Sequence, residues 1–273
     1  MYTGPTVFAV GLFIIMIQPI EISGKFDTRI STKGFCDVCQ SEHSMVLGYS
    51  APYARELFDT LTEAGRIDFD VPESEANPKL STDYLMGDAR GQMFGVLVVR
   101  DKDGNTGLLK AFSGQYNGLW NVAGWVPPLV DGLKMQTATA SIERYIKILG
   151  RRLETAQDAD IRKRLINKRK AISQALQKDI HNMYMVPNYC GTLKPLPEVV
   201  SGDGGIPTGT GDCCAPKLLG YAARNSLKPL GLAEFYFGQQ NKSGSKKHGG
   251  MYTSCKHKCS RILGYMLCGE CKI

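Results

Sequence analysis

The sequence has no apolar run long enough to cross a bilayer. Its most apolar stretch, residues 7–17, contains eleven residues, whereas a membrane-spanning helix needs about 20. This stretch lacks a preceding Lys or Arg and a following small-x-small cleavage site, so it departs from the signal-peptide pattern. We therefore expect a cytoplasmic protein without a membrane partner, in which residues 7–17 form a strand or an extraneous stretch. Secretion is the alternative.

The chain also lacks the even number of cysteines that a complete disulfide framework requires, because it contains nine. Two of the nine are adjacent, and four others form two Cys-x-x-Cys pairs. This arrangement is more typical of metal or thiol chemistry in a reducing compartment than of structural disulfides.

No internal repeat is present, and the periodicity of apolar residues predicts the secondary structure. Residues 94–99 and 108–112 alternate as strands around an Asp-Gly turn, which is typical of a β-hairpin. Asp158 or Asp160 can cap a helix, so the long helical pattern divides into a helical hairpin. The remaining predicted elements are helices at 51–64, 142–153, 161–183, 215–225 and 255–267, and a strand at 230–237.

Cysteines stand where the last two of these helices begin. Cys213 and Cys214 precede one helix, and Cys255 and Cys259 open the other. Thiolates at two helix N-termini can meet at one point, where the positive helix ends favour ionised sulfur. These four cysteines therefore form the first candidate zinc site. The alternatives are that they are buried and inert, or that they do redox chemistry.

The order of elements outside the hairpin resembles that of the zinc nucleotide-deaminase fold. The resemblance implies an α/β fold with a deaminase-like mixed sheet, flanking helices and a long helical-hairpin insertion at about 141–185. The domain would span residues 51–273, after an irregular segment, 1–50, that contains a Cys-x-x-Cys motif. The catalytic Glu position of that family holds Ala215 or Pro216 here, and Glu234 is the candidate replacement. The second cysteine motif is Cys-x-x-x-Cys rather than Cys-x-x-Cys, so deaminase activity is doubtful.

A second candidate metal site combines the two Cys-x-x-Cys pairs. Cys36, Cys39, Cys268 and Cys271 have the ligand number of a closed four-cysteine zinc site. His43 lies close to the first pair in the sequence.

Positive charge is concentrated in two segments. Residues 141–181 carry eleven Lys and Arg against five Asp and Glu, and residues 241–273 carry seven against one. Segregated positive charge favours a polyanionic partner such as RNA, although solvated helix faces give the same pattern. The candidate RNA contacts are Arg162, Lys163, Arg164, Lys168, Arg169, Lys170, Lys246 and Lys247.

Several segments resemble the N-terminal extension of bacterial RluA-type pseudouridine synthases. They are GTGDCCAPKLL (residues 209–219), KPLGLAEFYFG (228–238) and YTSCKHKCSRIL (252–263), and the resemblance covers about residues 91–267. The His-Arg-Leu-Asp motif of the synthase domain is absent from this sequence. The resemblance thus implies a role in RNA modification, without pseudouridine synthesis by this chain.

Three functions follow from these observations. The leading one is an accessory RNA-binding module of RNA modification. The alternatives are a zinc-dependent hydrolase acting on a nucleobase or nucleotide, and a protein-interaction module whose helical hairpin, resembling a coiled coil, pairs with a partner helix.

Overall fold

The computed structural model describes residues 7–10 and 13–270. Within these residues the protein is a mixed α/β structure with five α-helices and a five-stranded antiparallel sheet. The strand order is β11 (Met251–Tyr252), β10 (Lys228–Phe237), β6 (Gln92–Arg100), β7 (Thr106–Phe112) and β3 (Gln18–Pro19). The sequence predicted a mixed sheet, but every described strand pair in this sheet is antiparallel.

The hairpin predicted around the Asp-Gly turn is formed by β6 and β7, and β6 is the central strand of the sheet. Its turn is organised by Asp101, whose carboxylate accepts hydrogen bonds from the backbone N–H groups of Asp103 and Asn105 at 2.9 and 2.8 Å. Gly104 adopts a φ of 89°, a left-handed conformation that glycine reaches without steric cost.

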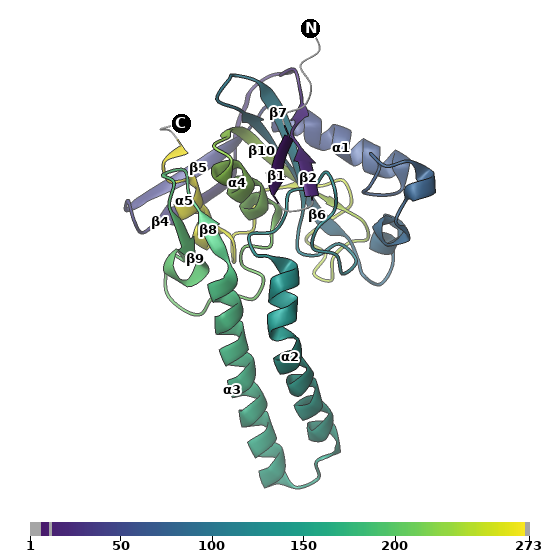
Figure 1. The fold of residues 1–273 in the computed structure, drawn as a ribbon, viewed down its shortest axis with the longest axis vertical. Coiled ribbons are helices and arrows are strands. Elements are labelled where there is room, and N and C mark those ends of the chain that lie inside the picture. The colour runs from purple at the N-terminus through teal and green to yellow at the C-terminus, as the bar shows by residue number, and fades with distance from the viewer. Residues whose placement is uncertain (1–6, 11–12, 271–273) are drawn as a thin grey trace.

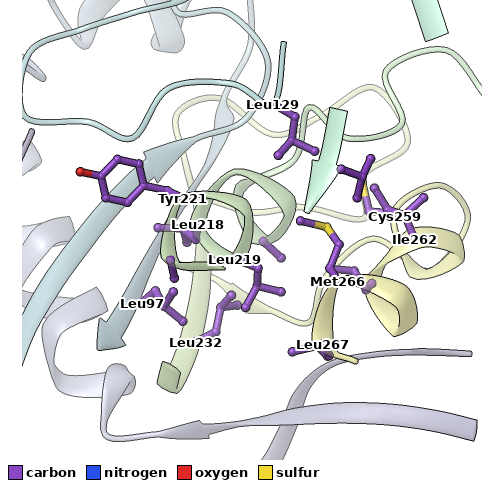
Figure 2. Packing of buried hydrophobic residues seen from close by; sticks show 14 of the residues in the cluster. Leu97, Leu129, Leu218, Leu219, Tyr221, Leu232, Cys259, Ile262, Met266 and Leu267 are labelled. Atoms are coloured by element: carbon purple, nitrogen blue, oxygen red, sulfur yellow. The ribbon is translucent and has the colours of Figure 1, made fainter. Parts of the chain in front are cut away.

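Helices cover both faces of the sheet, so its central strands are buried on both sides (Figure 1). On β6, Val96 and Val98 belong to a cluster with α1 (Ser50–Ala64). Leu97 and Val99 belong to a second cluster with α4 (Cys214–Arg224) and α5 (Ser260–Leu267). This alternation follows from the two-residue repeat of a strand. Figure 2 shows the second cluster, in which leucines of α4 lie between the sheet and α5.

Two long helices, α2 (Gly132–Thr155) and α3 (Ala159–Met183), lie side by side and project away from the body of the protein (Figure 1). Asp131 caps α2 through the N–H of Lys134 at 3.0 Å, and Asp158 caps α3 through the N–H of Ile161 at 2.8 Å. The first helix begins nine residues before the predicted start of the insertion at 141. No helix in the described part of the chain is long and apolar enough to cross a membrane.

Residues before 51 were predicted to be irregular, but the structure places strands there. β4 (Asp27–Cys36) and β5 (Ser41–Gly48) form an antiparallel hairpin. The buried residues of β4 are Ser31, Thr32, Gly34 and Cys36. Because these side chains are small or polar, the strand carries no alternation of large apolar residues, which explains why the pattern was missed.

The remaining elements are short. They are β1 (Val7–Val10), β2 (Phe13–Met16), β8 (Met185–Pro187) and β9 (Leu193–Pro195), with 3₁₀ turns at Glu73–Glu75, Pro78–Leu80, Asp83–Met86 and Leu196–Glu198. β1 pairs with β2, and β8 pairs with β9, both in antiparallel fashion.

The last helix is shorter than predicted. The pattern placed its start at residue 255, but α5 begins at Ser260, and Cys255 and Cys259 lie in the turn that precedes it. The N–H of Ser260 donates to the carbonyl of Cys255 at 3.0 Å. The exposed residues Lys256, His257 and Lys258 occupy this turn.

Two glycines let β4 pack directly on α5. A Cβ atom added at Gly34 would overlap the backbone of Ser260 and Gly264, and one added at Gly264 would overlap the backbone of Gly34 and Phe35. Neither strand nor helix can move away without opening the core. The close approach therefore requires glycine at both positions.

We predict that Gly264→Ala lowers the free energy of unfolding by about 2 kcal/mol, because the new methyl group meets backbone rather than a flexible side chain. Alanine otherwise favours a helix interior over glycine by about 1 kcal/mol. Gly150→Ala on α2 is the matched control, since its nearest neighbour is the Arg169 guanidinium at 3.7 Å. Urea unfolding of both variants measures the difference. Equal or greater stability of Gly264→Ala would contradict the close packing.

Candidate metal centre and buried carboxylate

Three cysteines and one histidine meet at one end of the β4–β5 hairpin. Cys36 ends β4, Cys39 lies in the turn, His43 lies on β5 and Cys268 follows α5. The Sγ atoms and one ring nitrogen of this cluster all lie within 4.8 Å of one another. These four side chains can hold a metal ion.

The hairpin geometry accounts for three of the four positions. Cys36 pairs with Ser41, so the four-residue turn between them carries Cys39 back over the first residues of β5. There Cys39 Sγ lies 2.9 Å from His43 Nε2. The fourth side chain, Cys268, reaches the hairpin because α5 packs against β4 at the two glycines.

The donor set of three sulfurs and one nitrogen matches a closed tetrahedral zinc site. The hydrogen bond from His43 lowers the pKa of Cys39 to about 7, which favours the thiolate that metals bind. Burial raises the pKa of Cys268 to about 12, with a further contribution from its neighbour Cys39. Adjacent thiols resist ionisation because neighbouring negative charges repel each other. A cation bound between them offsets this repulsion and stabilises the thiolates.

The structure brings together three of the four residues predicted for this site. Cys36, Cys39 and Cys268 are in the cluster, and Cys271 lies outside the described residues. The sequence places His43 four residues after Cys39, close to the first Cys-x-x-Cys pair. Its participation depends on the hairpin, which the sequence pattern did not predict.

The other predicted set, Cys213, Cys214, Cys255 and Cys259, is arranged differently. Cys213 is the N-cap of α4, and its thiol contacts both Cys255 and Cys259. Cys214 is fully buried, and its thiol donates to the Met93 carbonyl at 3.3 Å. In the described part of the chain, the ligand atoms that lie close enough together to share one metal ion are those of the hairpin cluster, not those of this second set.

Glu234 lies beside these cysteines in the interior. Its side chain is 3% exposed, and Ser254 Oγ donates to its carboxylate at 2.7 Å. The N–H of Ala215, at the start of α4, also donates to it. Gly95 leaves room for this arrangement, because a Cβ atom there would lie 2.8 Å from Cys214 Cβ and 3.2 Å from Glu234 Cγ. Burial raises the pKa of Glu234 to about 7.

The residues predicted to contact RNA divide into two groups. Arg162, Lys163, Arg164, Lys168, Arg169 and Lys170 are all exposed on α3. Lys247 is exposed in the loop after β10, whereas Lys246 is half-buried, with its ammonium 3.7 Å from the centre of the Tyr252 ring.

Lys217, which lies on α4 close to the two adjacent cysteines, is buried. It is 1% exposed, and its ammonium donates to the carbonyls of Phe112 and Gly114 at 2.8 and 2.6 Å. Burial lowers its pKa to about 8. This lysine therefore ties α4 to the end of β7 and is not available to a phosphate.

Asp212 precedes α4 but does not cap it. Cys213 occupies the N-cap position, and Asp212 accepts a hydrogen bond from the Tyr184 hydroxyl at 2.7 Å.

Comparison of the chain with family models, curated proteins and solved structures gives no match.

We predict that Glu234 makes the protein less stable as the pH rises from about 4.5 to about 7. The pKa of Glu234 in the folded protein is about 7, above its ordinary value of 4.5, so the folded state binds the proton more tightly than the unfolded state. The stabilisation is complete below pH 4.5 and is lost through pH 7.

Glu234→Gln keeps the shape and removes the titration. The difference in free energy of unfolding between this variant and the parent should rise by on the order of 3 kcal/mol as the pH increases across that range, because only the parent loses stability there. Urea unfolding of both proteins at several pH values tests the expectation, and parallel pH profiles would refute it.

Proposed function

We propose that this chain is an RNA-binding accessory module of RNA modification, that α2 and α3 contact the RNA, and that a zinc ion at the hairpin cluster stabilises the fold. The observation that carries the proposal is the unpaired positive charge on the projecting helix pair. We further propose a cytoplasmic location, where reducing conditions keep the nine cysteines available as thiols.

The helix pair is strongly basic, and ten of its Lys and Arg lie in residues 144–170, away from the body of the protein. Helices α2 and α3 together contain twelve Lys and Arg and four Asp and Glu. Among the described residues, no Lys or Arg of these helices takes part in an ion pair, since the pairs found all involve other elements. Unneutralised charge on an exposed surface attracts polyanions and makes their binding dependent on salt.

The shape of the pair supports the same function. Only five of its residues are buried, namely Gly132, Thr139, Leu149, Leu176 and His181. The core of the domain therefore does not account for the length of these helices. A projecting pair of basic helices can follow an RNA backbone without disturbing the packed sheet.

A zinc ion at Cys36, Cys39, His43 and Cys268 would act structurally. All four ligand positions come from protein side chains, which leaves no open position for a reacting water. The ion would join the β4–β5 hairpin to the end of α5, two segments far apart in the sequence.

Two alternatives are less well supported. The hydrolase alternative requires a carboxylate at the zinc-bound water, but Ala215 and Pro216 occupy the Glu position and Glu234 is closed off from solvent. Its raised pKa is explained by burial. The protein-interaction alternative draws on exposed apolar side chains such as Tyr145 and Ile166, yet these are few beside the charged residues.

We predict that the reduced protein, purified without chelator, carries about one equivalent of zinc. Cys39→Ser/His43→Ala should lose most of it, because two of four ligands are removed. Cys255→Ser is the control for the other cysteine set and should keep the metal. Elemental analysis measures the zinc content of each protein. Less than about 0.2 equivalents of zinc in the parent would contradict the proposed zinc site.

We predict that RNA binding weakens steeply with salt. For single-stranded RNA the slope of log K against log salt is about −0.7 per phosphate contact, so four contacts give roughly −3. Lys168→Ala/Lys170→Ala should flatten the slope by about 1.4, and stability should change by no more than about 0.5 kcal/mol.

The matched control is Lys79→Ala/Lys102→Ala, which removes the same charge from exposed positions away from the helix pair. Titration of a labelled RNA at several salt concentrations provides the slopes. Equal slopes for the two double variants, or no binding at low salt, would remove the basis for this function.

A further inference from the structure

A cavity of about 570 Å³ opens between β4 and the segment that leads into α5. Residues 30–35 of β4 form one wall, and Thr253, Ser254, Lys256, Ser260 and Arg261 form the other. The walls are held at this separation by a backbone hydrogen bond from Ser254 N–H to the Ser31 carbonyl at 3.0 Å. The cavity lies on the same hairpin as the metal-ligand cluster, because its lining includes Phe35 and Glu42, the chain neighbours of Cys36 and His43.

Two buried hydroxyls in the wall are without a partner. Ser31 and Thr32 are 2% and 3% exposed, and neither hydroxyl has a hydrogen-bond partner within the described residues. A buried hydroxyl without a hydrogen bond is costly, and such groups in native proteins usually have a partner. Because both residues line the cavity, a polar ligand seated there can supply the missing partners.

The same wall presents an exposed aromatic ring. Phe35 is 41% exposed and lines the cavity. An exposed aromatic ring at the edge of a cavity can stack a planar base.

Positive charge surrounds the opening. Lys33 and Lys256 are exposed in the lining, and Lys33 forms only a surface ion pair with Glu42 at 3.1 Å. Exposed pairs of this kind contribute little and are readily exchanged for another anion. The guanidinium of Arg261 instead donates to the carbonyls of Ser201, Gly202 and Gly205, which fixes the far wall.

A second cavity, of about 610 Å³, continues from the first along β4. The two share Ile30, Ser31 and Thr253 in their linings. The second adds Lys25, Arg55 and the ion pair of Arg29 with Asp27, whose atoms lie 2.6 Å apart. Lys25 and Arg55 therefore extend the positive charge from the first cavity into the second. A polynucleotide matches this arrangement better than a free nucleotide does.

We propose that these two cavities form one groove that binds single-stranded RNA, with one base stacked on Phe35, polar groups of that nucleotide bonded to Ser31 and Thr32, and the backbone phosphates held by Lys33 and Lys256. This inference deepens the proposed RNA-binding function and rests on it for the source of the nucleotide. It adds a site of base contact within the domain body, apart from the helix pair.

The test uses the full chain and two probes, a labelled single-stranded RNA octamer and the four free nucleoside 5′-monophosphates. Phe35→Leu should weaken octamer binding at least fivefold, because base stacking on an aromatic ring is lost. Phe26→Leu is the matched control, since Phe26 is 50% exposed and lies outside both cavity linings. Lys256→Ala should flatten the salt slope by about 0.7, whereas Lys242→Ala in the loop after β10 should leave it unchanged.

Thr32→Val separates binding from folding. It preserves the side-chain shape and removes a hydroxyl that has no partner in the described structure, so the ligand-free protein should be at least as stable as the parent. Octamer affinity should nevertheless fall about threefold or more. A variant that loses stability and keeps its affinity would show that the hydroxyl serves the fold and not a ligand.

The remaining outcomes are distinct. Unchanged octamer affinity in Phe35→Leu and Thr32→Val overturns the groove, whatever the helix-pair variants do. Monophosphates that bind with the same sensitivity to these variants, without octamer binding, overturn the assignment to RNA. Groove variants that weaken binding while Lys168→Ala/Lys170→Ala does not would support the groove and overturn the helix pair as the principal RNA surface.

Discussion

The contact between the backbones of β4 and α5 at Gly34 and Gly264 is the constraint on which both candidate sites depend. It sets the distance from the hairpin turn to Cys268, and so allows the three sulfurs and one imidazole to converge. It also fixes the wall of the groove opposite residues 253–261. A side chain at either glycine would separate the strand from the helix and disturb both sites together. The chemistry of the sites therefore depends on two residues that have no functional groups.

Charge and packing divide the molecule into two parts with different physical roles. The sheet and its covering helices bury apolar residues on both faces and carry most of the core. Helices α2 and α3 bury very little and carry much of the positive charge. Surface charges repel one another and do not stabilise a fold by themselves. Their separation from the core lets the protein present a strongly basic surface without lowering the stability of the sheet.

The sequence predicted the elements in which large apolar residues repeat with a clear period. The β6–β7 hairpin, α1, α3, α4 and β10 are found close to their predicted positions, because the buried valines, leucines and phenylalanines make the period visible. β4 was missed because its buried positions hold Ser31, Thr32 and Gly34. No rule based on hydropathy can recognise a strand whose inner face is polar or lacks a side chain.

The full ligand set could not be predicted for the same reason, since His43 meets Cys39 across a hairpin turn that the pattern did not indicate. The burial of Lys217 could not be predicted either. Its ammonium is buried because it donates to two carbonyls about a hundred residues away in the sequence, and no local pattern indicates that contact.

The ligand cluster joins residues 36–43 to residue 268, so the segment between them forms a loop of roughly 230 residues. A bond across so long a loop forms late, since the entropy of closing it must be offset by contacts that already exist. The β4–β5 hairpin is made early during synthesis, whereas its helix partner α5 is made after every strand of the sheet and both long helices. Until then its small and polar inner face has no surface to pack against. Metal binding at this cluster would therefore require that almost the whole described chain has been made, because the fourth ligand, Cys268, lies near its end.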